Sequence, residues 1–165
     1  MKSRNKLFLV ILVVLAISIP VPGSAETVTL PNDISWVYAA DTYRGSVQQA
    51  YLNAINRVKV LAEGKKPGTW CVVLDADETI ISNVQFQAEQ AAKGEGYSRD
   101  AWNAWCQRME ATALPGAIEF LTEVRNLGGK IIIVTNRQAP LGEPTVKNLE
   151  KVGIPFDVCL LREGV

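Results

Sequence analysis

The chain has 165 residues, with 17 basic and 17 acidic side chains, three cysteines and no histidine. Without histidine it cannot contain a Ser-His-Asp or Cys-His catalytic set, an H-E-x-x-H zinc site or a phosphohistidine intermediate. Any acid–base catalysis must therefore use carboxylates. The absence of a basic excess also speaks against a partner that is a nucleic-acid polymer.

The N-terminal residues 1–25 have the pattern of an export signal. Three basic residues precede an apolar run from Leu7 to Ile19, and small residues follow up to Ala25. We predict cleavage after Ala25, export to the periplasm or the exterior, and no stable membrane anchor afterwards. An uncleaved anchor is disfavoured, because a spanning helix needs about 20 apolar residues. Cleavage removes only basic charges and leaves residues 26–165 with a net charge of −3.

The rest of the chain, residues 26–165, is predicted to form one α/β domain. Apolar residues at helical spacing from Ser46 to Ala62 predict an amphipathic helix that begins earlier, near Ile34. Trp70 to Leu74 is a continuous apolar run, typical of a strand buried on both faces. Lys130 to Thr135 and Val158 to Leu161 predict two further strands. The helices between them are predicted at Gly116 to Leu127 and Pro144 to Val152. This alternation predicts a parallel sheet with right-handed crossovers.

One connection is too long for an ordinary loop. Glu78 to Ala113 spans 36 residues, whereas such loops usually have about 2–6. Within it we predict helices at Gln85 to Lys93 and Ser98 to Met109, with Ser98 as the N-cap. Because it follows the first strand, this insertion is expected over the carboxyl end of the sheet, as a candidate lid.

The three cysteines do not form an obvious site. Cys71 and Cys159 lie in predicted buried strands and Cys106 in a predicted helix. Free thiols that pack as small apolar groups are the favoured interpretation. Zinc binding is disfavoured because no C-x-x-C spacing is present.

Polar residues follow two of the predicted strands. Asp75 and Asp77 follow the first strand, two residues apart, so both can face the same crevice. Two carboxylates there suit Mg²⁺; alternatively, one attacks phosphorus while the other protonates the leaving oxygen. Thr135, Asn136 and Arg137 end the neighbouring strand and offer a hydroxyl and a cation for phosphoryl oxygens.

Structural interpretations compete with these. The aspartates also suit a strand-end turn, Glu78 and Thr79 a helix N-terminus, and Arg137 a solvated loop charge. Trp102 and Trp105 share a helical face, so they either pack the insertion onto the sheet or stack on an aromatic leaving group.

The two motifs together carry a family resemblance. V-V-L-D-A-D-E-T (Val72 to Thr79) and I-I-V-T-N-R (Ile132 to Arg137) resemble the first and second motifs of the haloacid-dehalogenase (HAD) superfamily. From Ile34 onward the chain resembles its subfamily IIIB, the class B and C bacterial acid phosphatases and their plant storage-protein relatives. The wider likeness rests on Asn83, Gly96-Tyr97-Ser98, Trp102, Trp105, Leu114-Pro115-Gly116-Ala117 and Cys159-Leu160-Leu161-Arg162.

The resemblance implies a fold, an activity and a set of roles. The fold would be a HAD-like Rossmannoid parallel sheet with helices on both faces and a small helical cap at about 78–113. The activity would be Mg²⁺-dependent hydrolysis of small phosphomonoesters. Asp75 would be the nucleophile and Asp77 the general acid and base, and both would bind the metal, Asp77 through its backbone carbonyl. Thr135 would bind phosphate, and Asn136 and Arg137 would support the substrate.

The chain departs from the family near its end. The family's phosphate-binding lysine and later acidic motif lie beyond the third strand, whereas the sequence ends at Val165. Lys147 and Lys151 fall in the preceding predicted helix and do not match that lysine. We therefore expect a C-terminally truncated acid phosphatase. The alternatives are an exported storage or binding protein that keeps the fold without catalysis, or an inactive truncated phosphatase.

Overall fold

The computed structural model of the chain describes residues 29–163. The predicted export signal, residues 1–25, lies outside this range. Among the helices of residues 29–163, none combines the length and the apolar character that crossing a membrane requires.

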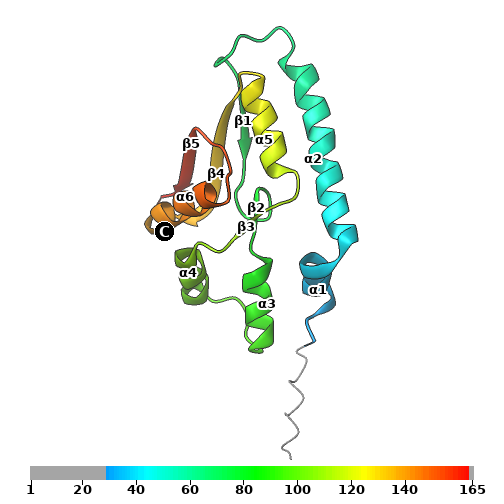
Figure 1. Cartoon of the computed structure of the whole chain (residues 1–165). Coiled ribbons are helices and arrows are strands. Elements are labelled where there is room, and N and C mark those ends of the chain that lie inside the picture. Colours follow the sequence, from blue (N-terminus) through cyan, green and yellow to red (C-terminus); the bar gives the residue numbers. More distant parts are fainter. Residues whose placement is uncertain (1–28, 164–165) are drawn as a thin grey trace, which may run out of the picture.

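The N-terminal part of the domain consists of two helices, α1 (Asn32–Ala39) and α2 (Asp41–Ala62). The sequence predicts one continuous helix here, and this is wrong because Ala40 between them has an extended backbone, with φ −80° and ψ 127°. Helix α2 packs against α5 (Ala117–Asn126), and Figure 1 shows it as an outer layer beyond α5. Tyr51 and Phe120 meet at this contact, with their ring centroids 5.8 Å apart.

The main sheet has three parallel strands in the order β1 (Cys71–Leu74), β4 (Lys130–Gln138) and β5 (Val158–Arg162). Helix α5 connects β1 to β4, and the short 3₁₀ helix η1 (Ala139–Leu141) with α6 (Gly142–Lys151) connects β4 to β5. The predicted α/β class and parallel sheet are therefore confirmed. Strand β4 runs three residues further than predicted and includes the whole Thr135 to Arg137 motif.

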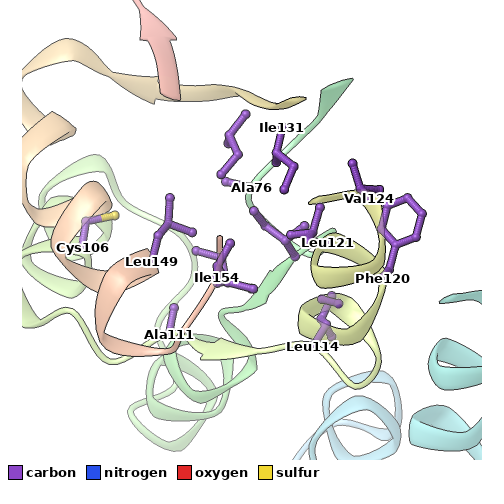
Figure 2. Packing of buried hydrophobic residues seen from close by; sticks show 14 of the residues in the cluster. Ala76, Cys106, Ala111, Leu114, Phe120, Leu121, Val124, Ile131, Leu149 and Ile154 are labelled. Atoms are coloured by element: carbon purple, nitrogen blue, oxygen red, sulfur yellow. The ribbon is translucent and has the colours of Figure 1, made fainter. Parts of the chain in front are cut away.

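The hydrophobic core lies on one face of this sheet. Ile131 and Ile133 of β4 are fully buried, and they pack with Leu121 and Val124 of α5 and Leu149 of α6. Figure 2 shows Ile131, Leu121, Val124 and Leu149 in this cluster. Both crossover helices therefore bury their apolar stripes against the same side of the sheet.

The opposite face of the sheet is open within residues 29–163. Val73 is 60% exposed and Leu160 is 51% exposed, and Val134 and Val158 are similarly accessible. The prediction of a first strand buried on both faces is therefore wrong, and within residues 29–163 both crossover helices lie on one face of the sheet. In a parallel sheet such a face is normally covered.

The three thiols are free but differ in burial. Cys106 is buried, and burial raises the pKa of its thiol to about 11. Cys159 is half-buried, and Cys71 is exposed on β1. The prediction of a buried thiol is therefore wrong for Cys71, because its side chain belongs to the open face.

The insertion after β1 contains the two predicted helices, α3 (Val84–Ala92) and α4 (Arg99–Arg108). Ser98 caps α4 as predicted, since its hydroxyl accepts a hydrogen bond from the backbone N–H of Ala101 at 3.2 Å. Two short antiparallel strands, β2 (Ile81–Ser82) and β3 (Thr112–Ala113), pair at the base of the insertion and were not predicted. In Figure 1, α3 and α4 lie at the end toward which the strands of the main sheet point.

A salt bridge joins the two helices of the insertion. Arg108 at the end of α4 donates a hydrogen bond to Glu89 of α3 at 2.8 Å and also contacts Glu110. These bonds from Arg108 lower the pKa of Glu89 to about 2. Helices α3 and α4 are therefore linked to each other in addition to the contacts of the insertion with the sheet.

Gly116 lets the chain turn from the insertion into α5. Its φ is +88°, in the left-handed region, and a Cβ atom placed there would lie 2.7 Å from Cβ of Tyr51. The close packing of α2 on α5 therefore requires glycine at this position.

We predict that Gly116→Ala lowers the free energy of unfolding by about 1–3 kcal/mol, because it adds both backbone strain and a clash with Tyr51. Gly45 is the matched control, since it lies in helix α2 and a Cβ atom added there would meet only its own stretch of the helix within 4 Å. Gly45→Ala should stabilise the protein by about 0.5–1 kcal/mol. Urea denaturation of both variants measures the two effects, and equal shifts would contradict the prediction.

Candidate active site

A tight turn follows β1 and orients its first acidic residue. The carbonyl of Ala76, which is fully buried, accepts hydrogen bonds from the N–H groups of Thr79, Ile80 and Ile81 at 3.0–3.3 Å. Asp75, one residue earlier, is exposed, and its Oδ1 accepts a hydrogen bond from the Ala76 N–H at 2.7 Å. Asp75 faces outward at the end of β1, while Ala76 points into the core.

Glu78 has a structural role in this turn. Its φ of 53° places it in the left-handed region, and its Oε1 accepts a hydrogen bond from the backbone N–H of Asn83 at 2.7 Å. Asn83 is the N-cap residue of α3. Glu78 therefore lies in the turn after β1 and not, as the structural interpretation expected, at a helix N-terminus. Its carboxylate nevertheless satisfies a donor at the start of α3.

Helix α2 holds the same turn from the other side. The Tyr51 hydroxyl donates a hydrogen bond to the carbonyl of Thr79. Burial raises the pKa of Tyr51 to about 12, so the hydroxyl keeps its proton and remains a donor near neutral pH. The turn after β1 is therefore fixed by the core, by α3 and by α2.

Asp77 forms an ion pair with Arg137 of β4. Arg137 donates to Oδ1 of Asp77 from Nη2 at 2.7 Å and from Nε at 3.1 Å, and Nε also lies 3.1 Å from Oδ2. The Arg137 side chain is 1% exposed, whereas that of Asp77 is 24% exposed. A buried guanidinium needs such a partner, since an unpaired charge in the interior is very unfavourable.

Three further residues complete the shell around Arg137. Nη1 donates to the hydroxyl of Thr145 on α6 at 3.3 Å, and Nη2 donates to Oδ1 of Asn83 at 3.2 Å. The indole N–H of Trp105 donates to the same Oδ1 at 2.8 Å, and Asn83 in turn donates to Asp77 at 2.9 Å. The guanidinium therefore joins β4, α6 and the insertion around one carboxylate. This placement excludes the solvated loop charge considered for Arg137.

Thr135 and Asn136 lie on opposite sides of β4. Thr135 is buried, and its hydroxyl accepts a hydrogen bond from the backbone N–H of Arg137 at 3.2 Å. Asn136 is exposed and lines a small hollow of about 80 Å³, together with Arg99, Trp102, Asn103 and Arg137. The structure therefore places the Thr135 hydroxyl against the backbone N–H of Arg137, while Asn136 and Arg137 both border the small hollow.

The two tryptophans of α4 have different surroundings. Trp105 is 2% exposed and belongs to the core. Trp102 is half-buried, meets Phe86 edge-on with ring centroids 5.3 Å apart, and has the Arg137 guanidinium 5.4 Å from its ring centre. Both contribute to packing the insertion, but only Trp102 of these two also lines an open pocket.

That pocket has a volume of about 690 Å³ and lies between α1 and the insertion. Asp77 and Glu78 line it, together with the aromatic side chains of Phe86, Tyr97 and Trp102. Asp75 and Thr135 are not among its lining residues. The pocket therefore adjoins the carboxylate pair on the side of Asp77.

Residues 29–163 contain no cluster of three or more acidic or thiol side chains spaced to hold a metal ion. The two aspartates after β1 suit Mg²⁺ in part. Asp75 has one carboxylate oxygen beyond the one bonded to the Ala76 N–H, and Mg²⁺ prefers oxygen ligands. The Asp77 carboxylate is held by Arg137, so its backbone carbonyl is the better donor. These two groups leave most positions of an octahedral shell to other ligands.

Several residues of this network were not assigned a role from the sequence. Thr145 and Asn148 are fully buried polar residues on the same stripe of α6 as Leu149. Polar side chains on an apolar stripe were a signal that partners would be found. Asn148 bonds both backbone groups of Ala111 at the end of the insertion. No such signal marks Tyr51, because an aromatic residue on the apolar face of a helix is already explained by packing.

Comparison with known proteins supports a single family. A family model described as HAD superfamily, subfamily IIIB (Acid phosphatase), matches residues 25–163. The class C acid phosphatase from Bacillus anthracis is similar in structure, with a TM-score of 0.72 and 33% sequence identity, over 78% of this chain and 56% of that chain.

Plant proteins are similar over shorter stretches. Vegetative storage protein 1 of Arabidopsis thaliana is 30% identical over 50% of this chain and 31% of its own length. Acid phosphatase 1 of Solanum lycopersicum is 28% identical over 49% of this chain and 32% of its own length. The matched stretch thus corresponds to about a third of these curated relatives.

We predict that separating the buried ion pair is strongly destabilising. Arg137→Gln or Asp77→Asn should each lower the free energy of unfolding by about 3–5 kcal/mol, since each leaves a desolvated group without its partner. The double variant should lose less than the sum of the two. The exposed pair of Lys147 and Glu143 is the control, and Lys147→Gln should leave the unfolding midpoint unchanged. Additive losses at Asp77 and Arg137 would show that the pair is not coupled.

Proposed function

Because the chain belongs to subfamily IIIB of the HAD superfamily, the acid phosphatases, we propose that it hydrolyses phosphomonoesters with Asp75 as the nucleophile. The observation that carries this proposal is the contrast between two neighbouring carboxylates. Asp75 is exposed at the carboxyl end of β1 with one oxygen held by the Ala76 N–H, whereas Asp77 is fixed by Arg137. The first is free to attack and the second is held in position.

The reaction that we propose has two steps. In the first, the free oxygen of Asp75 attacks phosphorus, the bond to the ester oxygen breaks, and Asp77 gives a proton to the departing alcohol. In the second, water attacks the phosphoryl group on Asp75, and Asp77 takes a proton from that water. Inorganic phosphate leaves and Asp75 is regenerated. We assign proton transfer to Oδ2 of Asp77, because Oδ1 accepts bonds from Nε and Nη2 of Arg137 and from Asn83, whereas of these donors only Nε also reaches Oδ2.

The strand-end residues of β4 would have separate roles. We propose Thr135 as the hydroxyl that contacts the phosphoryl group, since it lies toward the carboxyl end of β4, bonded to the backbone N–H of Arg137. Arg137 uses Nε, Nη1 and Nη2 for protein partners, so we assign it to positioning Asp77. Asn136 would meet only a part of the substrate that reaches its exposed side of β4.

Magnesium is the cofactor that we propose, held by the Asp75 carboxylate and the Asp77 backbone carbonyl. When bound, the ion would neutralise charge on the phosphoryl oxygens. We also propose export, from the basic and apolar pattern of residues 1–25, and a small-molecule phosphomonoester as the substrate.

A second candidate function is storage or binding without catalysis. It is favoured by one observation, the 30% identity to Vegetative storage protein 1 of Arabidopsis thaliana. Retention of the Asp75, Asp77 and Thr135 set favours the phosphatase, because storage does not require a free carboxylate at a strand end.

Phosphatase activity tests the main proposal. Hydrolysis of an aryl phosphate is measured at mildly acidic pH with Mg²⁺, for the 165-residue chain and for a joined chain. The joined chain is residues 1–163 followed by the part of the Bacillus anthracis phosphatase that lies beyond its equivalent of Glu163. We expect Asp75→Asn to lower the rate by about 10³-fold or more in the active form.

The control for this experiment is Asp41→Asn, because Asp41 is 99% exposed at the start of α2. It should keep full activity. Full activity of Asp75→Asn would show that Asp75 is not the nucleophile. If neither the 165-residue chain nor the joined chain hydrolyses the aryl phosphate without this substitution, the phosphatase proposal is contradicted.

Metal binding separates the two candidate functions without measuring turnover. If Asp75 and Asp77 hold Mg²⁺, the ion should stabilise the folded chain by about 2.7 kcal/mol at 100 times its dissociation constant. Thermal unfolding with and without Mg²⁺ measures this shift, and Asp75→Asn should remove most of it. A storage protein without a metal site would show no Mg²⁺-dependent shift, either unsubstituted or as Asp75→Asn.

A further inference from the structure

The small hollow beside Asn136 lies between the insertion and the ends of β4 and β5. Three elements supply its polar lining, namely the start of α4, the end of β4 and the end of β5: Arg99, Asn103, Asn136, Arg137, Gln138 and Arg162. Among the residues that the structure describes, no acidic side chain lines it. The hollow therefore gathers guanidinium and amide groups from parts of the chain that are far apart in the sequence.

Two of its three guanidinium groups carry charge that no acidic side chain balances. Arg137 is paired with Asp77, so its charge is neutralised within the protein. Arg99 and Arg162 are exposed, and neither forms a salt bridge with another side chain of residues 29–163. Asp100 follows Arg99, but adjacent residues on a helix do not face each other, and Asp100 does not line the hollow. The hollow therefore has a net positive charge.

This composition is typical of a site for a compact oxyanion. The planar guanidinium group of arginine presents its N–H donors in a fixed fork that matches two oxygens of a phosphate or a carboxylate. The side-chain amides of Asn103, Asn136 and Gln138 can donate further hydrogen bonds. Tyr97 and Trp102 also line the hollow, and such walls strengthen a charge interaction because they exclude water.

The larger pocket between α1 and the insertion has the opposite charge. Asp77, Glu78 and Glu95 line it, and no basic residue in the described part of the chain does so. Tyr97 and Trp102 border both cavities, which are therefore adjacent. An anionic group is repelled by the pocket of about 690 Å³ and attracted to the hollow of about 80 Å³. Charge therefore directs a compact anion to the hollow.

The hollow is close to the proposed phosphoryl contact. Thr135 directly precedes Asn136 and Arg137 on β4, and consecutive Cα atoms are only about 3.8 Å apart. On the basis of the proposed phosphatase function, we propose that the hollow binds a second anionic group, a phosphate or a carboxylate, on the leaving group of the substrate. Arg99 and Arg162 are its specificity-determining residues. The substrate class is then a phosphomonoester that carries a further oxyanion.

Protection of arginine side chains tests anion binding without using enzyme activity. The 165-residue chain is treated with phenylglyoxal, which modifies guanidinium groups, and the modification of each arginine is followed by mass spectrometry. Inorganic phosphate is the probe, and chloride at the same ionic strength is the reference. At ten times its dissociation constant, phosphate should slow the modification of Arg99 and Arg162 about tenfold. Arg57 is the control, because it is exposed on α2 and does not line the hollow, so it should react equally in both salts.

Two variants show whether the two arginines share one bound anion. In Arg99→Gln the protection of Arg162 should be lost, and in Arg162→Gln the protection of Arg99 should be lost. Arg57→Gln should leave the protection of both unchanged. All three side chains are exposed, so these substitutions leave the core intact. If phosphate does not protect Arg99 and Arg162, or if Arg162 stays protected in Arg99→Gln, the proposal is overturned.

Hydrolysis of matched esters tests whether the anion belongs to the substrate. Monophosphates and bisphosphates of alkanediols differ only in the second phosphate, and several chain lengths cover different spacings between the two groups. They are compared in the form, the 165-residue chain or the joined chain, that hydrolyses the aryl phosphate. We expect kcat/KM of the best bisphosphate to exceed that of its monophosphate by about tenfold. Arg99→Gln should abolish this preference, whereas Arg57→Gln should keep it.

The outcomes separate this proposal from the phosphatase proposal. If phosphate protects Arg99 and Arg162 but the two kinds of ester have equal kcat/KM, the hollow is a site for free phosphate, and its assignment to the substrate is overturned. If neither form hydrolyses any ester, the phosphatase proposal fails. The protection of the two arginines then still shows whether the hollow binds an oxyanion, because that measurement needs no turnover.

Discussion

The buried guanidinium of Arg137 is the group around which this domain is arranged. A cation with 1% of its side chain exposed requires an anion and further acceptors at fixed positions. Asp77 supplies the anion from the turn after β1, Thr145 supplies a hydroxyl from α6, and Asn83 supplies an oxygen from the start of α3. Elements far apart in the sequence are therefore held at the carboxyl end of the sheet because each satisfies part of one charge.

This arrangement explains how one short motif contains two carboxylates with different surroundings. Asp75 and Asp77 are both aspartates and lie two residues apart. However, Ala76 between them is buried in the core, and Asp77 is paired with Arg137. Asp75 remains exposed, with one of its oxygens bonded to the Ala76 N–H. Enzymes often separate the roles of paired carboxylates by environment in this way. The insertion contributes to the separation, because Asn83 and Trp105 are part of the shell that holds Asp77.

The sequence predicted the fold where the signal was local. Strand ends, crossover helices and the Ser98 cap follow from apolar runs and capping chemistry, and the structure has them within a few residues. The break at Ala40 was not predictable, since the apolar spacing on both sides is helical. The direction of the Arg137 side chain was not predictable either. Spacing placed it at the strand end, but whether it meets phosphate or Asp77 depends on Asn83 and Thr145, which reach it only through the tertiary fold.

The open face was missed for a related reason, and it bears directly on the site. A continuous apolar strand such as Val72 to Leu74 predicts burial on both sides, but it cannot say which polypeptide provides the second layer. By the alternation of β1, Asp75 falls on the same side as Val73, and both are exposed. Charge interactions weaken in water and strengthen where water is excluded. Because Val73 and Asp75 share this side, anything that excludes water from Val73 would also strengthen the charge interactions of the Asp75 carboxylate.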